Sequence, residues 1–180
     1  MICNKLRECV GAHFSGESVL WDCPNGEGNC IQSFDKRNRI TCGEKGKRYT
    51  YVNTRGLDVL NYRMDGGVIK QDRTVPQGTV KCDHVIVVKD ASPLAVFVEL
   101  KGTDVSHALE QISETMKRES ALVKSSARVY ARIVMTGSVP KIQTTKAYKD
   151  LYQFILRMGG GNIKMRTFDF AELDTDLDKQ

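Results

Sequence analysis

An almost uninterrupted apolar run from Leu94 to Leu100, broken only by Glu99, restricts the fold of this chain more than any other feature. Such a run is typical of a strand in the middle of a sheet whose two faces are both covered. Val129 to Met135 is a second run of this kind, and residues 104–123 between them carry apolar side chains at helical spacing. This strand, helix, strand passage predicts an α/β fold, because such a crossover joins parallel strands.

The remaining elements fit the same sheet. At 180 residues the chain is long enough to bury a core without a metal or disulfides. We expect one α/β domain with a central mixed β-sheet flanked by helices, in which a meander precedes the crossover. The other expected elements are an amphipathic helix over 1–14, an aromatic strand around 49–52, strands over 59–64 and 81–88, a long helix over 144–158 and a last strand over 163–170.

The single domain 1–180 divides into segments that differ in amino-acid composition. Its second segment is rich in Gly, Asn and Cys, with turn signals at Pro24-Asn25-Gly26 and Cys42-Gly43-Glu44, and is interpreted as an insertion. The segments are an opening helix at 1–14, a Cys/Gly-rich insertion at 15–57, a catalytic core at 59–136, a closing helix and strand at 144–170 and an acidic tail at 171–180.

Composition indicates an intracellular protein. The first residues lack the apolar core of a signal peptide, and no later stretch approaches the ~18 apolar residues of a membrane span. The six cysteines therefore suit reduced thiols, and we expect a cytoplasmic location. The formal net charge is +5 although the C-terminal tail is acidic, so the body is more basic than the total suggests. A polyanionic partner fits this charge but is not required by it.

Charged side chains at the ends of two apolar strands are the candidate catalytic group. Because side chains alternate along a strand, Glu99 and Lys101 point to one side while Leu100 points to the other. Asp83 begins the strand expected over 81–88. Adjacent strands lie only about 5 Å apart, so Asp83 can meet Glu99 if the two strands are neighbours.

Two converging carboxylates predict a bound cation, because they repel each other without one. Oxygen ligands without His or Cys favour Mg²⁺ or Mn²⁺ over zinc, with Asp83 and Glu99 as the metal ligands. Magnesium shares its coordination sphere with substrate phosphate, which makes phosphodiester hydrolysis the expected reaction. Lys101 could orient the attacking water, favour its deprotonation, or neutralise charge on the pentacovalent transition state.

Asp83 followed by Glu99-Leu100-Lys101, after two strands and before a helix that carries Gln111, resembles the PD-(D/E)XK nuclease superfamily. The resemblance covers roughly residues 59–136 and implies a restriction-endonuclease-like fold, with metal-binding Asp83 and Glu99, a catalytic Lys101 and a supporting Gln111. Cys82 stands where the motif has its proline. Some members also use an acid from the first helix, for which Glu8 and Asp65 are the candidates.

The sequence therefore predicts a magnesium-dependent nuclease acting on nucleic acid, with DNA favoured over RNA. The resemblance also implies a homodimer or a larger nuclease assembly, and no membrane association is expected. Two alternatives stay open. One is a catalytically inactive nuclease fold that binds nucleic acid or a protein, and the other is a small inhibitor or immunity factor in which Asp83 and Glu99 are ordinary surface charges.

Three further sets of residues are weaker candidates. His107 lies one helical turn before Gln111 and shares its flank of the expected helix. Cys23, Cys30 and Cys42 with His13 could hold a zinc ion, but their spacing lacks the close Cys-X-X-Cys pairs of strong zinc sites. Basic residues on the two long helices could contact phosphates or simply face solvent: Lys117, Arg118, Lys124, Lys141, Lys146 and Lys149.

Overall fold

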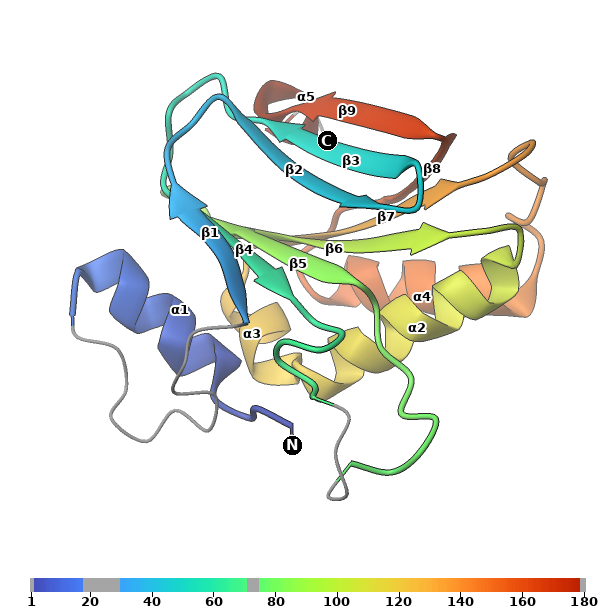
Figure 1. Cartoon of the computed structure of the whole chain (residues 1–180), viewed down its shortest axis with the longest axis horizontal. Coiled ribbons are helices and arrows are strands. Elements are labelled where there is room, and N and C mark those ends of the chain that lie inside the picture. Colours follow the sequence, from blue (N-terminus) through green and yellow to red (C-terminus); the bar gives the residue numbers. More distant parts are fainter. Residues whose placement is uncertain (1, 18–29, 71–74, 179–180) are drawn as a thin grey trace.

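The computed structural model describes residues 2–17, 30–70 and 75–178, and its centre is a six-stranded mixed sheet (Figure 1). The strand order is β1-β4-β5-β6-β7-β8. These strands are β1 (Ile31–Asp35), β4 (Val59–Arg63), β5 (His84–Val88), β6 (Leu94–Lys101), β7 (Arg128–Met135) and β8 (Ile163–Thr167). The helices are α1 (Leu6–Ser15), α2 (Val105–Arg118), α3 (Ser120–Ser125), α4 (Lys146–Arg157) and α5 (Asp174–Asp178). A smaller sheet contains β2 (Arg39–Glu44), β3 (Lys47–Val52) and β9 (Asp169–Leu173).

The connections confirm the expected α/β fold with a mixed sheet. β4, β5 and β6 form an antiparallel meander, and β6 pairs parallel with β7 after the chain crosses over through α2 and α3. β8 continues the parallel half of the sheet. β5 is buried along its whole length, as is β6 apart from the half-buried Lys101 at its end, because both faces of the sheet are covered.

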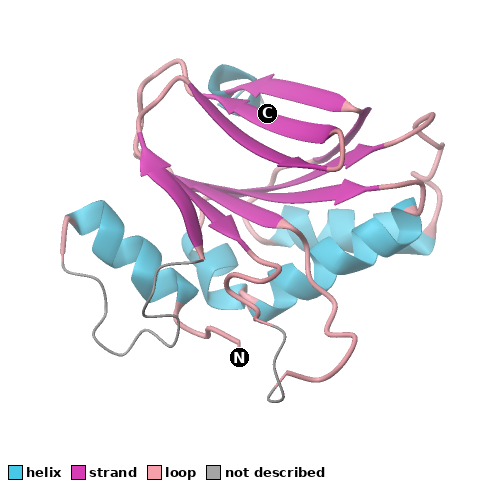
Figure 2. Cartoon of the chain, in the orientation of Figure 1, coloured by secondary structure: helices cyan, strands magenta, loops and turns pink. Residues whose placement is uncertain are grey.

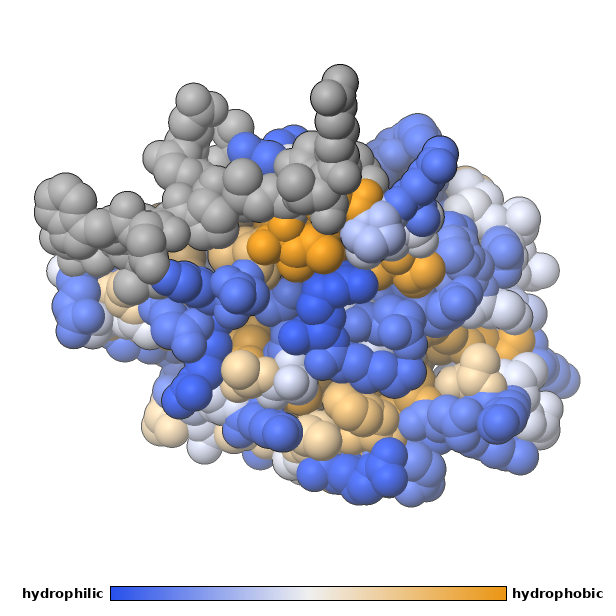
Figure 3. Space-filling view, turned by 90° about the horizontal axis from the view of Figure 1, so that it is seen from below, coloured by the Kyte–Doolittle hydropathy of each residue, from blue (hydrophilic) through white to orange (hydrophobic). Residues whose placement is uncertain are grey.

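Helices α1 to α4 cover one face of the large sheet, and the small sheet together with α5 covers the other (Figure 2). On the helical side, Ala95 and Phe97 of β6 join one apolar core together with the inner faces of α1, α2 and α4. On the other side, Val96 and Val98 join a second core with residues of β2, β3 and β9. The outer surface of the helical layer is mostly hydrophilic, with smaller hydrophobic areas between the polar side chains (Figure 3).

Two predicted elements each consist of two shorter ones. The helix predicted over 104–123 is interrupted at Glu119, which caps the end of α2 and precedes α3. The strand predicted over 163–170 is divided at Phe168, whose φ of 57° lies in the left-handed region. This residue turns the chain out of the large sheet, so that β9 pairs with β3 in the small one.

Most of the segment predicted to be an insertion belongs to the folded core. Residues 30–57 supply β1 at the edge of the large sheet and both strands of the β2–β3 hairpin, while 18–29 lie outside the described residues. The acidic segment at 171–180 is also partly internal. β9 extends to Leu173, and the side chains of Glu172 and Asp174 are buried.

A buried ion pair explains why the C-terminal segment docks. Arg132 interrupts the apolar run of β7 and is fully buried, and its Nε donates to Oε2 of Glu172 at 2.6 Å. Lys164 Nζ and the hydroxyl of Tyr49 donate to the same carboxylate at 2.8 Å and 3.2 Å. A buried guanidinium is costly without such partners, so Glu172 fixes β9 against β7 and β8. Within the described parts of the chain, no helix has the length and apolar character needed to cross a membrane.

Candidate active site

The register of β5 and β6 brings Asp83 and Glu99 together. His84 is paired with Val98, and one step further along the ladder the backbone N–H of Asp83 donates to the Val98 carbonyl at 3.1 Å. The Asp83 carboxylate then accepts the backbone N–H of Leu100 at 2.7 Å. Asp83 and Glu99 are therefore cross-strand neighbours where β5 begins and β6 ends.

The Glu99 carboxyl group is buried without full hydrogen bonding. Its residue is only 2% exposed, and Oε2 has no hydrogen-bond partner among the described residues. Burial, reinforced by the neighbouring charge of Asp83, raises the pKa of Glu99 to about 9. A native structure rarely leaves a buried polar atom unpaired, so this oxygen requires an explanation such as an ion or water.

Burial also raises the pKa of Asp83, but by less than that of Glu99. Burial raises the pKa of Asp83 to about 6, although the hydrogen bond from Leu100 acts in the opposite direction. The charges of Glu44 and Asp65 raise it further, while Lys101 lowers it. The negative charges near Asp83 would therefore favour a cation beside it.

Lys101 is held beside the carboxylates by a side chain from α2. Its Nζ is 4.0 Å from Oε1 of Glu99 and donates to Oε1 of Gln111 at 2.7 Å. The Gln111 amide nitrogen in turn donates to the backbone carbonyl of Lys81 at 2.8 Å. Gln111 therefore connects the helix to the end of β6 and to the segment before β5, and it orients the lysine.

A cavity of about 360 Å³ opens next to Asp83. Glu44 from the β2–β3 hairpin and Asp65 line it, as does His84, whose pKa is lowered to about 4 by burial and by Arg63, so that its imidazole is neutral at pH 7. The complete lining consists of Gln32, Gly43, Glu44, Arg63, Asp65, Asp83 and His84.

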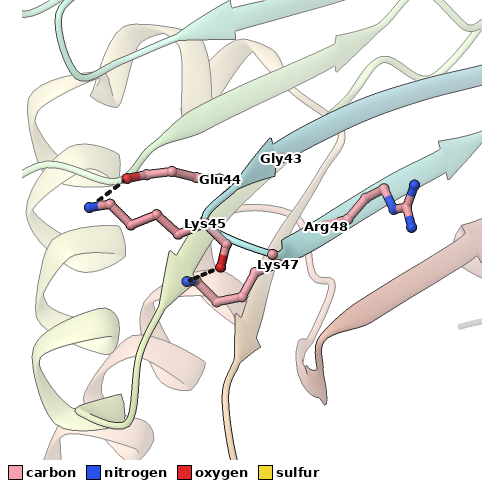
Figure 4. A pocket seen from close by; sticks show the side chains of 6 residues that line it. Gly43, Glu44, Lys45, Lys47 and Arg48 are labelled. Carbon is pink, nitrogen blue, oxygen red and sulfur yellow. Dashed lines mark hydrogen bonds and ion pairs between the residues drawn. The ribbon is translucent and has the colours of Figure 1, made fainter.

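The tip of the β2–β3 hairpin forms a second pocket, of about 320 Å³, from residues 43–48. Figure 4 shows Glu44 and Lys45 extending to one side of the tip and Arg48 to the other. The Glu44 carboxylate is 3.0 Å from the Lys45 ammonium. Sequence reasoning did not find the hairpin, because the pairing that positions it is distant along the chain. Its signals were the turn Cys42-Gly43-Glu44 and the aromatic strand predicted around 49–52, which corresponds to β3.

The two further acids considered from the sequence differ in position. Asp65 lines the cavity beside Asp83, and its carboxylate is 3.2 Å from the Lys81 ammonium. Glu8 is exposed on α1, which packs against α3 and lies across the molecule from the hairpin tip (Figure 1). The structure therefore does not bring Glu8 together with Asp83 and Glu99. His107 Nδ1 is 3.1 Å from Oε2 of Glu110 on α2.

The zinc site considered for the cysteines does not form from the described residues. Cys30 and Cys42 lie in separate cores on opposite faces of the large sheet, so they cannot share an ion. His13 Nδ1 is 2.8 Å from the Cys9 carbonyl, and Cys23 lies outside the described residues. Across residues 2–17, 30–70 and 75–178, no three His, Cys, Asp or Glu side chains form a group that could hold a metal.

The basic residues of the helical layer have mixed environments. Lys117 is 2.6 Å from Glu114, and Arg118 donates to the Val80 carbonyl at 3.1 Å. The other four are exposed: Lys124, Lys141, Lys146 and Lys149. Their contact with phosphates stays a prediction.

Comparison with protein-family models, with curated proteins and with solved structures finds no match to this chain. The geometry of the site is therefore the basis for its function.

We expect the metal-free protein to lose stability as the pH rises from about 5 to about 9. The folded-state pKa values of Asp83 and Glu99, about 6 and about 9, exceed their ordinary values of 3.8 and 4.5. The folded protein therefore keeps protons that the unfolded chain releases. The stability from these protonated groups is complete below the ordinary values and is lost as the pH rises through the folded-state values.

Thermal unfolding across this pH range, with chelator and with magnesium, measures the effect. Magnesium should raise Tm most at high pH, where both carboxyls are ionised. The Glu99→Gln variant should show a flatter profile in chelator, and the difference from wild type isolates Glu99 from other titrating groups. Equal pH profiles for the two proteins would contradict the environment assigned to Glu99.

Proposed function

We propose that this protein is a metal-dependent phosphodiesterase. More particularly, we propose a nuclease that resembles the PD-(D/E)XK, restriction-endonuclease-like superfamily and cleaves DNA in preference to RNA. The observation that carries the proposal is the buried Oε2 of Glu99 beside Asp83 and Lys101, which has no hydrogen-bond partner in the described parts of the chain. An acid pair with a lysine fits a reaction in which negative charge develops on a phosphoryl group.

The donor set fits Mg²⁺ or Mn²⁺ better than zinc. Asp83 and Glu99 offer only carboxylate oxygens, and magnesium is commonly bound by one or two carboxylates with water and substrate phosphate. When bound, the ion would supply charge stabilisation at the phosphoryl oxygens and a lowered pKa for the attacking water. A pair of protein ligands is sufficient for this role, because the substrate completes the coordination.

The protein side chains supply orientation and charge. Asp83 is fixed by the Leu100 N–H, and Gln111 fixes the Lys101 ammonium by accepting its hydrogen bond. Lys101 is therefore held where it could orient a water molecule or stabilise the negative charge of the transition state. The elements around the site support the resemblance, since α1, the β4–β5–β6 meander, α2 and β7 occur in the order that it implies.

The buried position of Glu99 favours the enzyme over an inhibitor with ordinary surface charges, because a carboxylate at such a position is costly unless it has a task. The second candidate is a catalytically inactive nuclease fold that binds nucleic acid or a protein. A cytoplasmic location belongs to the same proposal. No disulfide joins the described cysteines, which suits a reducing compartment: Cys3, Cys9, Cys30, Cys42 and Cys82. Assembly as a homodimer or within a larger nuclease assembly, which the resemblance implies, is also part of the proposal.

Incubating the purified protein with single-stranded, duplex and branched DNA and with RNA, with magnesium or chelator, tests the proposal. We expect magnesium-dependent cleavage of at least one DNA substrate and weaker cleavage of RNA. Binding without cleavage in every magnesium and manganese reaction would favour the inactive module. Neither binding nor cleavage would contradict a nucleic-acid function altogether.

A further inference from the structure

Phe168 is an exposed aromatic residue in a strained backbone conformation. Its residue is 55% exposed, and its φ of 57° lies in the left-handed region that bulky residues seldom adopt. The surrounding backbone holds it there, because its N–H donates to the Met135 carbonyl at 3.0 Å and its carbonyl accepts the Arg48 N–H at 2.8 Å. The fold needs a left-handed residue at this corner, but Gly or Asn would meet that need with less strain.

The aromatic ring therefore needs a reason other than stability. A Phe side chain with more than half of its residue exposed buries little apolar surface, so it contributes little to the core. Strained residues that persist in a fold are concentrated at functional sites. The exposure of the ring and the strain of its backbone together indicate a functional role for Phe168.

Phe168 lies at the same edge of the large sheet as the candidate active site. Lys101 of β6 is paired with Met135 of β7, which is paired with Thr167 of β8, the residue just before Phe168. At about 4.8 Å for each strand step, Thr167 is roughly 10 Å from Lys101 along this edge. Stacked nucleotides advance about 3.4 Å along one strand, so the interval corresponds to about three nucleotides.

Basic side chains lie beside this path. The tip of the β2–β3 hairpin lies at this edge, on the face of the large sheet opposite to α2. It carries Lys45, which is 82% exposed in its side chain and pairs with Glu44 at 3.0 Å, and Arg48, whose backbone N–H donates to the Phe168 carbonyl. Arg48 also pairs with Asp169 at 3.0 Å. Arg166 of β8 is exposed just before the Phe168 corner. Cationic side chains, two of them paired with Glu44 and Asp169, thus lie near an exposed aromatic ring. Cationic side chains together with exposed aromatic rings are the combination by which proteins bind single-stranded nucleic acid.

We propose that Phe168 is a stacking platform for an unpaired nucleobase about three nucleotides from the scissile phosphate. The preferred substrate is then single-stranded DNA, or DNA with an unpaired end or flap, because a paired base inside a duplex cannot offer its face to the ring. This inference rests on the proposed nuclease function and names the substrate class of the same site.

Binding in chelator tests the inference without cleavage. We would measure the affinity of wild type for a short single-stranded oligonucleotide carrying the fluorescent base 2-aminopurine, and for a blunt duplex of the same sequence. We expect tighter binding of the single strand and quenching of 2-aminopurine. Phe168→Asn should weaken single-strand binding about tenfold and remove the quenching, with little change for the duplex. Phe168→Tyr should keep both properties, because the tyrosine ring also stacks.

Two controls separate the possible results. Leu156→Asn removes another exposed apolar side chain, on α4, and should leave binding unchanged. Phe168→Asn should unfold at the temperature of wild type or above, because Asn tolerates the left-handed region, and this excludes misfolding. If wild type binds DNA and Phe168→Asn matches its affinity and quenching, the stacking proposal is overturned while the nuclease proposal stands. If wild type binds no nucleic acid, both are overturned.

Discussion

Replacing Glu99 with glutamine is expected to lower magnesium-dependent cleavage by at least about two orders of magnitude. The change keeps the size of the side chain but removes the charge that would bind the ion. Without metal, the variant should be at least as stable as wild type. The Glu99 carboxyl is buried beside Asp83 and has its pKa raised to about 9, so it carries an ionisation cost that the amide lacks. Cleavage rate and Tm in chelator measure the two effects.

A matched substitution shows whether the effect is specific to the site. Glu110→Gln removes one exposed carboxylate from α2. The carboxylate of Glu110 is 3.1 Å from Nδ1 of His107. It should leave cleavage within about twofold of wild type, as expected for surface positions away from a functional site. Nucleic-acid binding in chelator should persist in both variants. Cleavage by Glu99→Gln at the wild-type rate would show that the proposed active site is wrong.

Much of the sheet could be predicted because its central strands are buried on both sides. Leu94 to Leu100 and Val129 to Met135 are apolar for this reason, and the helix between them shows its period through the face it buries. Asp83, Glu99, Lys101 and Gln111 were also accessible, since they lie within a short stretch of neighbouring elements.

The parts that could not be predicted depend on pairings between distant segments. The small sheet joins β3 to β9 across more than a hundred residues, and no local period reports such a contact. Glu44 reaches the site only through this sheet. Phe168 gives no sequence signal either, because its left-handed backbone follows from the corner between two sheets.

One missed feature did have a signal. Arg132 interrupts the apolar run of β7 in the way that Glu99 interrupts that of β6. The environments of the two charges differ. Arg132 forms a double hydrogen bond with Glu172, whereas one oxygen of Glu99 has no hydrogen-bond partner among the residues that the structure describes. A charged residue inside an apolar strand thus predicts a buried charge with a structural or functional role. Only its hydrogen-bond and ion-pair partners distinguish a structural ion pair from a site that requires an ion.

Replacing Lys101 with methionine should abolish most cleavage while leaving magnesium affinity in place. Methionine keeps an unbranched apolar side chain but removes the ammonium, which lies 4.0 Å from Glu99 Oε1 and is hydrogen-bonded to Gln111. Loss of a charged group that acts on the transition state costs about two to three orders of magnitude in rate. Asp83 and Glu99 are unchanged, so magnesium should still raise Tm, and more than in wild type because no competing cation remains.

Gln111→Met provides the graded comparison, because it keeps the lysine and removes only the group that orients it. Its rate should fall by less than that of Lys101→Met, about tenfold, since Lys101 can still reach the site in part of the population. Magnesium should raise the Tm of wild type, Lys101→Met and Gln111→Met. The Glu99→Gln variant should lose this response. Lys101→Met that cleaves like wild type would exclude the lysine from the reaction. Lys101→Met that neither cleaves nor responds to magnesium would assign Lys101 to the shape of the metal site instead of to the transition state.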